Sequence, residues 1–225
     1  METKSVSQIK TLLQARKNFR QPFKLPLSDA ETFQALAYAV YCEVKARGGE
    51  LVNSAEFERQ LTEATMFLTE GKKYGLMIMG TTGNGKTTLM RAVQSLINVM
   101  EVKSWTGETI AMREVSAKDV VRLARDNYGD FISLCRYPAL AIDDLGEEPI
   151  EVVSYGNSFN PLIDLLSIRY DAQLLTIITT NTPTKDIRSI YGARIADRLN
   201  EMMHIIIFSN KSYRDKLKHK TEKTS

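Results

Sequence analysis

The sequence predicts an α/β fold in which a parallel β-sheet lies between two layers of helices. Five short apolar runs alternate with segments whose apolar residues recur at helical spacing, which is typical of parallel strands joined by crossover helices. A glycine-rich loop, an acidic pair and an asparagine directly follow three of these runs. Ligands of such sheets bind at the carboxyl ends of the strands, so this arrangement favours a three-layer domain with a binding site at one edge of its sheet.

Two helices are expected before the first strand. Ser28 and Glu31 form a capping box that opens a helix reaching about Ala46, and a glycine pair then stops it. A second helix opens at Asn53 and ends near Gly71. The fold is therefore predicted to carry a helical N-terminal extension ahead of the sheet.

The remaining elements are alternating strands and helices. Each predicted strand is a short apolar run, and these runs cover residues 76–79, 109–115, 139–142, 174–180 and 205–208. Helices are expected to begin at residue 85 and after Ser116, and to cover residues 160–170 and about 186–201. Together they predict a five-stranded parallel sheet covered on both faces.

Residues 80–87 carry the most specific motif of the chain. They read Gly-Thr-Thr-Gly-Asn-Gly-Lys-Thr and fit G-x-x-x-x-G-K-[ST], the phosphate-binding loop of nucleoside triphosphatases, between a predicted strand and a predicted helix. The glycines allow backbone N–H groups to turn toward a phosphate, and the helix N-terminus adds a favourable dipole. Lys86 supplies a charge for the β- and γ-phosphates, and the Thr87 hydroxyl is suited to ligate Mg²⁺. The predicted ATP-binding residues of this loop are Gly80, Thr81, Thr82, Gly83, Asn84, Gly85, Lys86, Thr87 and Thr88.

An acidic pair, Asp143 and Asp144, directly follows the predicted strand at 139–142. The carboxyl end of that strand is expected beside the phosphate loop. Asp143 is predicted to hold Mg²⁺ through its water shell, and Asp144 to orient or deprotonate the attacking water. The alternative is a polar turn that caps the strand, because Asp-Asp-Leu-Gly also has turn chemistry.

Asn181 and two arginines complete the candidate site. Asn181 follows the strand at 174–180, where its amide can hydrogen-bond the attacking water or the γ-phosphate. Alternatively, it only opens the turn before Pro183. Arg194 and Arg198 lie four residues apart and share one helix face. Guanidinium groups suit the stabilisation of a γ-phosphate in transfer, although such a run is usually a solvated charged face.

Taken in order, these motifs resemble those of the DnaC/IstB-type branch of the AAA+ ATPases. The resemblance covers about residues 55–215, and the matching segments are the phosphate loop, residues 142–146, 179–181, 191–199 and Ser212-Tyr213-Arg214. By this resemblance, Asp143 and Asp144 are the Walker B acids, and Asn181 is sensor 1.

The same resemblance gives roles to three arginines. It implies that Arg198 is an arginine finger offered to a neighbouring subunit, with Arg194 as the competing candidate, and that Arg214 is the sensor 2 analogue. It also implies that the five strands have the order 5-1-4-3-2. Only residues 209–225 follow the last predicted strand, so the helical lid of most AAA+ proteins is not expected, as in this branch of the family.

The family contains replicative helicase loaders and transposition helper proteins, and the sequence does not separate the two. We expect an ATP-hydrolysing switch associated with DNA, either a DnaC-like helicase loader or an IstB-like transposition helper. Its partners would be ATP, Mg²⁺, single-stranded DNA bound without sequence specificity, a replicative helicase or a transposase, and further copies of itself across the ATP site.

Two other enzyme classes share the phosphate loop. A small-molecule kinase needs an acceptor pocket, whereas two acids with a strand-end asparagine suit the activation of water. A GTPase would read guanine through N-K-x-D, and the nearest match, residues 210–213, ends in Tyr213.

Composition excludes several further classes. The chain is 43% hydrophobic and 25% charged, as is ordinary for a globular protein, and its net charge of +3 does not require a nucleic-acid partner. Two cysteines far apart exclude a disulfide framework and a cysteine-rich zinc site. No apolar stretch approaches the roughly 20 residues that cross a bilayer, and no signal peptide is recognisable. We therefore expect a cytoplasmic protein without membrane contact.

Three regions are expected along the chain. Residues 1–52 form an N-terminal arm and helix that could dock a partner, residues 53–215 form the ATPase domain, and residues 216–225 form a basic tail. Basic residues of the arm and the tail can contact DNA phosphates, although solvated tails have the same composition.

Overall fold

A computed structural model describes residues 5–8, 10–11, 21–103, 107–150, 152–154 and 157–210, and a five-stranded sheet lies at its centre. In spatial order the strands are β2 (Met112–Ser116), β3 (Ala139–Leu145), β6 (Leu175–Thr180), β1 (Gly75–Gly80) and β7 (Met203–Phe208). All neighbouring pairs in this sheet are parallel. Counted along the chain from the opposite edge, this is the order 5-1-4-3-2, so the predicted topology is confirmed.

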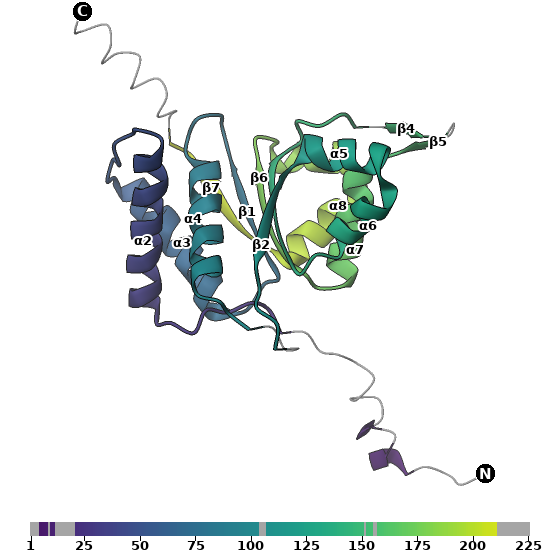
Figure 1. Cartoon of the computed structure of the whole chain (residues 1–225), viewed down its shortest axis with the longest axis horizontal. Helices are drawn as coiled ribbons and strands as arrows, with labels where there is room; N and C mark the ends of the chain where they lie inside the picture. Colours follow the sequence, from purple (N-terminus) through teal and green to yellow (C-terminus); the bar gives the residue numbers. More distant parts are fainter. Residues whose placement is uncertain are drawn as a thin grey trace, which may run out of the picture.

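Helices cover both faces of the sheet, which confirms the three-layer prediction (Figure 1). One layer consists of α2 (Asp29–Ala46), α3 (Ala55–Glu70) and α4 (Lys86–Val99). The other consists of α5 (Ala117–Asp126), α6 (Tyr128–Cys135), α7 (Pro161–Asp171) and α8 (Thr184–Met202). Side chains of β1 alternate between two cores, because Leu76 and Ile78 pack with the first layer while Met77 and Met79 pack with the second.

Helix starts follow the capping residues closely. The Ser28 hydroxyl accepts a hydrogen bond from Glu31 N (3.3 Å), and the Glu31 carboxylate accepts one from Ser28 N (2.9 Å), which confirms the capping box. The second helix was expected to open at Asn53, but its N-cap is Ser54. The extended Ser54 backbone places its Oγ 3.2 Å from Phe57 N.

Two elements of the structure were not predicted. The eight-residue helix α6 follows α5 directly, with Asn127 as its N-cap and Phe131 buried in the core. A short antiparallel hairpin consists of β4 (Val152–Ser154) and β5 (Asn157–Phe159). Both elements are too short for a recognisable period in the sequence.

The start of β2 also differs from the prediction of a strand over residues 109–115. Thr109 forms an antiparallel bridge with Lys103, and Ile110 N donates to Val102 O (2.8 Å). Because these backbone groups are used in a local turn, the strand joins the sheet only at Met112.

The helix predicted at about 186–201 is observed as α8, but it contains a break. Gly192 has φ 84° and ψ 162°, values that are not helical and that strongly favour glycine. The break separates the first part of α8 from the second part, which carries Arg194 and Arg198.

The largest fully buried side chain is that of Arg169, on α7. Its guanidinium donates to Thr176 Oγ1 (2.8 Å) and to three backbone carbonyl oxygens, those of Cys135 (3.2 Å), Tyr137 (2.8 Å) and Leu175 (2.5 Å). Burial lowers the pKa of Arg169 to about 9. This arginine therefore connects α7 to the carboxyl end of α6 and to the start of β6. No local pattern in the sequence predicts that its side chain is buried.

Replacing Arg169 with methionine should lower the free energy of unfolding by about 2–4 kcal/mol, because several buried carbonyl oxygens lose their donor. Urea unfolding followed by circular dichroism measures this change. The control is Arg188→Met, since Arg188 is exposed and forms a surface pair with Asp197 (3.6 Å), which contributes about 0–1 kcal/mol. Equal effects of the two substitutions would contradict the structural role of Arg169.

The N-terminal helix α2 shares a core with the sheet. Leu25, Leu36 and Val40 are buried in the cluster that also contains Leu89 and Val93 of α4. The boundary proposed between residues 52 and 53 stays a prediction, and the structure adds that α2 packs directly on α4, the helix that follows the glycine-rich loop. The expected basic tail and the expected lack of a helical lid concern residues 211–225, which lie outside the described part of the chain. No helix among the described residues is long and apolar enough to cross a membrane.

Candidate nucleotide-binding site

The predicted phosphate loop connects β1 to α4 at the carboxyl edge of the sheet. Gly83 (φ 81°) and Gly85 (φ 102°) have left-handed backbones, which favour glycine. A Cβ on Gly80 would lie 2.5 Å from Phe208 O, so this position also requires glycine. The loop is therefore tight, and it ends at the N-terminus of α4, where free N–H groups favour an anion.

Lys86 is buried at the centre of the loop, with a residual exposure of 6%. Its Nζ donates to Thr81 O (2.8 Å), Asn84 Oδ1 (3.3 Å) and Asn181 Oδ1 (2.7 Å). Asn181 follows β6, which is the neighbour of β1 in the sheet. The structure thus brings together two predicted site residues that are 95 positions apart.

Thr87 and Asp143 meet in the same region. The Thr87 hydroxyl donates to Asp143 Oδ1 (3.0 Å), and the Thr179 hydroxyl donates to the same oxygen (2.5 Å). A hydroxyl beside one carboxylate is a hard oxygen donor set that fits Mg²⁺, which takes few protein ligands and completes its shell with water and phosphate oxygens. The described residues contain no cluster of three or more histidine, cysteine or acidic side chains suited to a metal.

Asp144 sits at an irregular point of β3. The pairing register of β3 with β6 shifts between Ile142 and Leu145, and Asp144 has φ 56°. Its backbone N–H donates to Thr179 Oγ1 (2.9 Å). Burial, and then the neighbouring Asp143 carboxylate, raise the pKa of Asp144. Such bulges occur next to active sites, where they redirect a side chain.

Two further acids, Glu147 and Glu148, contact the predicted site residues and their surroundings. Glu147 Oε1 accepts a long hydrogen bond from Asn181 Nδ2 (3.5 Å). The buried Glu148 accepts from Gly146 N (2.8 Å) and from the hydroxyl of Tyr191 on α8. Burial and this hydrogen bond raise the pKa of Tyr191. The run Asp-Asp-Leu-Gly-Glu-Glu was the available signal, but only its first two acids were predicted to have a role.

The side chain of Asn84 anchors the loop from behind. It is fully buried, and its Nδ2 donates to Phe208 O (3.1 Å) at the end of β7. Asn210 Nδ2 donates to Asn84 O (3.0 Å), and Gln60 Nε2 on α3 donates to Asn210 Oδ1 (2.9 Å). Because its amide is used inside the protein, a phosphate contact from Asn84 would come from its backbone N–H.

Arg198 lies near the amino ends of the strands, opposite to the carboxyl ends where the phosphate loop lies. Its guanidinium donates to Asp171 Oδ1 (2.9 Å) and stacks over the Tyr170 ring (4.6 Å to the ring centroid). Tyr170 and Asp171 end α7, just before β6 begins, whereas the phosphate loop follows the end of β1. The six residues of β6 separate the two edges, a distance of about 20 Å at a rise of about 3.3 Å per residue. Arg198 is therefore not part of the same chain's phosphate site.

Of the other two arginines, Arg194 is exposed on α8. Arg214 lies outside the described residues. Asn210, the last residue of the described part of the chain, contacts the phosphate loop through Asn84 O.

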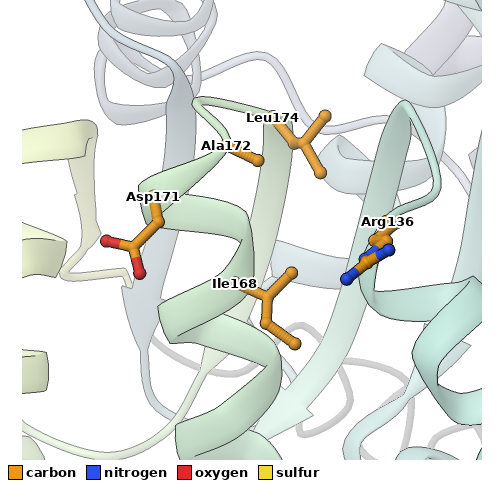
Figure 2. Close-up of a pocket in the computed structure, with 5 residues that line it drawn as sticks. All are labelled: Arg136, Ile168, Asp171, Ala172 and Leu174. Carbon is orange, nitrogen blue, oxygen red and sulfur yellow. The ribbon is translucent and has the colours of Figure 1, made fainter.

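A pocket of about 430 Å³ also lies near the amino ends of the strands (Figure 2). It is lined by Arg136, Ile168, Asp171, Ala172 and Leu174. These residues belong to or follow α6 and α7, ahead of the strands β3 and β6. This pocket is therefore separate from the phosphate loop.

No protein-family model matches the sequence, and no curated protein sequence matches it. Solved structures do match. A DnaC helicase loader is 23% identical over 71% of this chain and 94% of that chain, with a TM-score of 0.55. DnaI is 19% identical over 85% of this chain and 95% of that chain, with a TM-score of 0.56.

AMPPCP-bound DnaA from Aquifex aeolicus is 14% identical over 77% of this chain, with a TM-score of 0.52. The match spans about half of that DnaA structure, 53% of its chain. At these identities the likeness establishes a shared fold. The chain has the α/β fold of DnaC-type AAA+ domains, and the resemblance noted in its sequence is confirmed at that level.

Proposed function

We propose, on the basis of a fold shared with DnaC-type AAA+ domains, that this chain is an ATP-hydrolysing switch that loads a replicative helicase. The observation that carries the proposal is the convergence of Lys86, Thr87, Asp143 and Asn181. These residues come from the start of α4, the end of β3 and the end of β6, and they contact one another in two pairs. Such convergence has no role in a chain whose glycine-rich loop is only a turn.

Each residue then has a defined task. The loop backbone and Lys86 bind the phosphates, and Thr87 and Asp143 would hold Mg²⁺, which would neutralise charge on the β- and γ-phosphates. Asn181 Oδ1 accepts a hydrogen bond from Lys86 and can instead accept one from the attacking water, whereas its Nδ2, now at 3.5 Å from Glu147 Oε1, can donate to the γ-phosphate. Asp144 orients or deprotonates that water.

The proposal includes self-association because of the position of Arg198. An arginine about 20 Å from its own phosphate loop can act on a γ-phosphate only if that nucleotide belongs to another subunit. Arg198 also has a buried Nη1 without a hydrogen-bond partner among the described residues. We propose Arg198 as the finger and Arg194, which is exposed, as the alternative.

The transposition helper remains the second candidate, because it would use the same ATP site. The two differ in their partner, so a pull-down with a hexameric replicative helicase in one arm and a transposase in the other separates them. Single-stranded DNA is the proposed nucleic-acid partner in both cases. The small-molecule kinase is less well supported, because Asp144 and Asn181 beside the phosphate loop suit the activation of water.

Lys86→Ala tests the nucleotide site. Losing two or three charge-assisted hydrogen bonds should raise the Kd for ATP about 100-fold, measured by titration with fluorescent ATP. Lys72→Ala is the control, because Lys72 is exposed and forms a surface ion pair with Glu70 (3.1 Å). Both variants should remain folded by circular dichroism. Wild-type affinity in folded Lys86→Ala would overturn the assignment of the phosphate loop.

A further inference from the structure

The end of α2 reaches the start of the phosphate-binding helix α4, and the two helices pack side by side (Figure 1). Arg47, the C-cap of α2, donates from its Nη1 to Thr88 Oγ1 (3.2 Å). Thr88 is the third residue of α4, directly after Lys86 and Thr87. An arginine 41 positions earlier in the chain therefore lies beside the phosphate site.

The position of Thr88 indicates which part of a nucleotide Arg47 faces. Lys86 contacts Asn181, and Thr87 contacts Asp143, so these two residues face the γ-phosphate and metal side of the site. Each residue of a helix is turned by about 100° from the previous one, so Thr88 points away from that side. In this motif the loop and the helix start also cradle the α-phosphate. Through Thr88, Arg47 contacts the start of α4 on another side of the helix than the one from which Lys86 and Thr87 reach Asn181 and Asp143.

The guanidinium of Arg47 has donors available for an anion. Its side chain is 44% exposed, and within the described residues its partners are Thr88 Oγ1 and Glu43, at the long distance of 3.9 Å. Glu43 itself accepts from Ser95 Oγ (3.4 Å). Five N–H groups in a planar fork match a phosphate well, and one contact to a hydroxyl uses only one of them.

The backbone around Arg47 is held in place, which limits the entropy lost on binding. Gly48 N donates to Lys45 O (2.9 Å), and Gly49 N donates to Val44 O (3.0 Å). Gly48 has φ 70°, so the chain ends α2 with a left-handed residue and turns away. The long side chain of Arg47 then extends from this terminus to the start of α4, while Glu43, one turn earlier, accepts from Ser95 further along α4.

We propose that Arg47 binds the α-phosphate of the bound nucleotide, as a residue of the ATP site that lies outside the phosphate loop. This proposal rests on the proposed function, because it needs a nucleotide at the loop. It gives α2 a direct part in nucleotide binding, although α2 precedes the motifs that mark the ATP site in the sequence.

The experiment compares Arg47→Ala and Arg47→Lys with the wild type by calorimetric titration with ATP and with ADP. Both nucleotides carry an α-phosphate, so Arg47→Ala should weaken both by the same factor, about 5–10-fold, as expected for one charge-assisted contact. Arg47→Lys keeps the charge but loses the fork, so its loss should be smaller. The control is Lys45→Ala, because Lys45 lies over the Tyr41 ring (5.8 Å to the centroid) and not at α4.

The outcomes separate the two proposals. Wild-type affinity of Arg47→Ala for both nucleotides, with the wild type binding normally, overturns the role of Arg47 and leaves the proposed function intact. A loss for ATP alone also overturns it, because that pattern places Arg47 at the γ-phosphate. Failure of the wild type to bind either nucleotide overturns the proposed function and the role of Arg47 with it.

Discussion

Asp144→Asn is expected to bind ATP and Mg²⁺ as the wild type does but to hydrolyse ATP about 10²–10⁴-fold more slowly, the usual contribution of a general base. The substitution removes the carboxylate that orients or deprotonates water and leaves the proposed metal ligands Thr87 and Asp143 in place. Asparagine also tolerates the positive φ of Asp144. The loss of rate should therefore come from chemistry and not from backbone strain.

Steady-state phosphate release and a separate ATP titration measure the two parts of this prediction. Asp126→Asn is the matched control, because Asp126 is an exposed acid that pairs with Arg125 (2.7 Å) at the end of α5. Turnover of Asp144→Asn at the wild-type rate would show that Asp144 only shapes the turn after β3. A parallel loss of ATP binding would instead move Asp144 among the metal ligands.

Arg198→Ala is expected to keep the ATP affinity of the isolated subunit and to lose the part of hydrolysis that depends on assembly. An arginine supplied in trans contributes about 10³–10⁵ in rate in GTPases, and we expect about 10²–10³ here, because Asp144 has a shorter side chain than the commoner glutamate. In the wild type, turnover per subunit should rise with protein concentration or with added single-stranded DNA. Steady-state hydrolysis over a concentration series measures both effects.

Mixing experiments distinguish a finger from a structural arginine. Lys86→Ala has no working phosphate site but carries an intact Arg198, so mixing it with Arg198→Ala should restore activity in some subunit pairs. Arg194→Ala, made in parallel, tests the competing candidate. No rescue on mixing, together with wild-type turnover that is independent of concentration, would mean that the ATP site is complete within one chain. Arg198 would then only stabilise the end of α7 through Asp171 and Tyr170.

The contacts that Arg198 makes within its own chain affect how the mixing experiment is interpreted. In the single chain its guanidinium is held by Asp171 and lies over Tyr170, so a contact with a neighbouring subunit has to compete with this arrangement. A thermal melt of Arg198→Ala is therefore needed beside the kinetics. Rescue on mixing supports the finger where the variant melts at the wild-type temperature, because association with an intact subunit can also stabilise a weakened one.

Local patterns determined much of this fold. The strands β1, β3, β6 and β7 are apolar runs, the helices α2 and α5 begin at recognisable capping residues, and α4 begins at the glycine-rich loop, because these signals depend on neighbouring residues. The phosphate loop is likewise a local motif, in which glycine is needed for the backbone angles of residues 83 and 85. The order of the strands, by contrast, came from resemblance to a family and not from any period in the sequence.

Short elements and exact boundaries were harder to predict. The hairpin β4–β5, the helix α6 and the start of β2 depend on a few hydrogen bonds; strands of three residues and a helix of only about two turns show no clear period. The observed N-cap of α3 is Ser54, one residue after the predicted Asn53. Both residue types can cap a helix, and only the backbone geometry selects between them.

Local motifs are enough to predict that Lys86, Thr87 and Asp143 bind phosphate and Mg²⁺. Which distant residues come into contact depends on the packing of the helices and the sheet. The contact of Arg47 with Thr88, the four hydrogen bonds of Arg169 and the position of Arg198 at the opposite edge of the sheet all depend on how helices pack on the strands. Such pairs are far apart in the chain and leave no local period, so they become visible only once the layers of the fold are assembled.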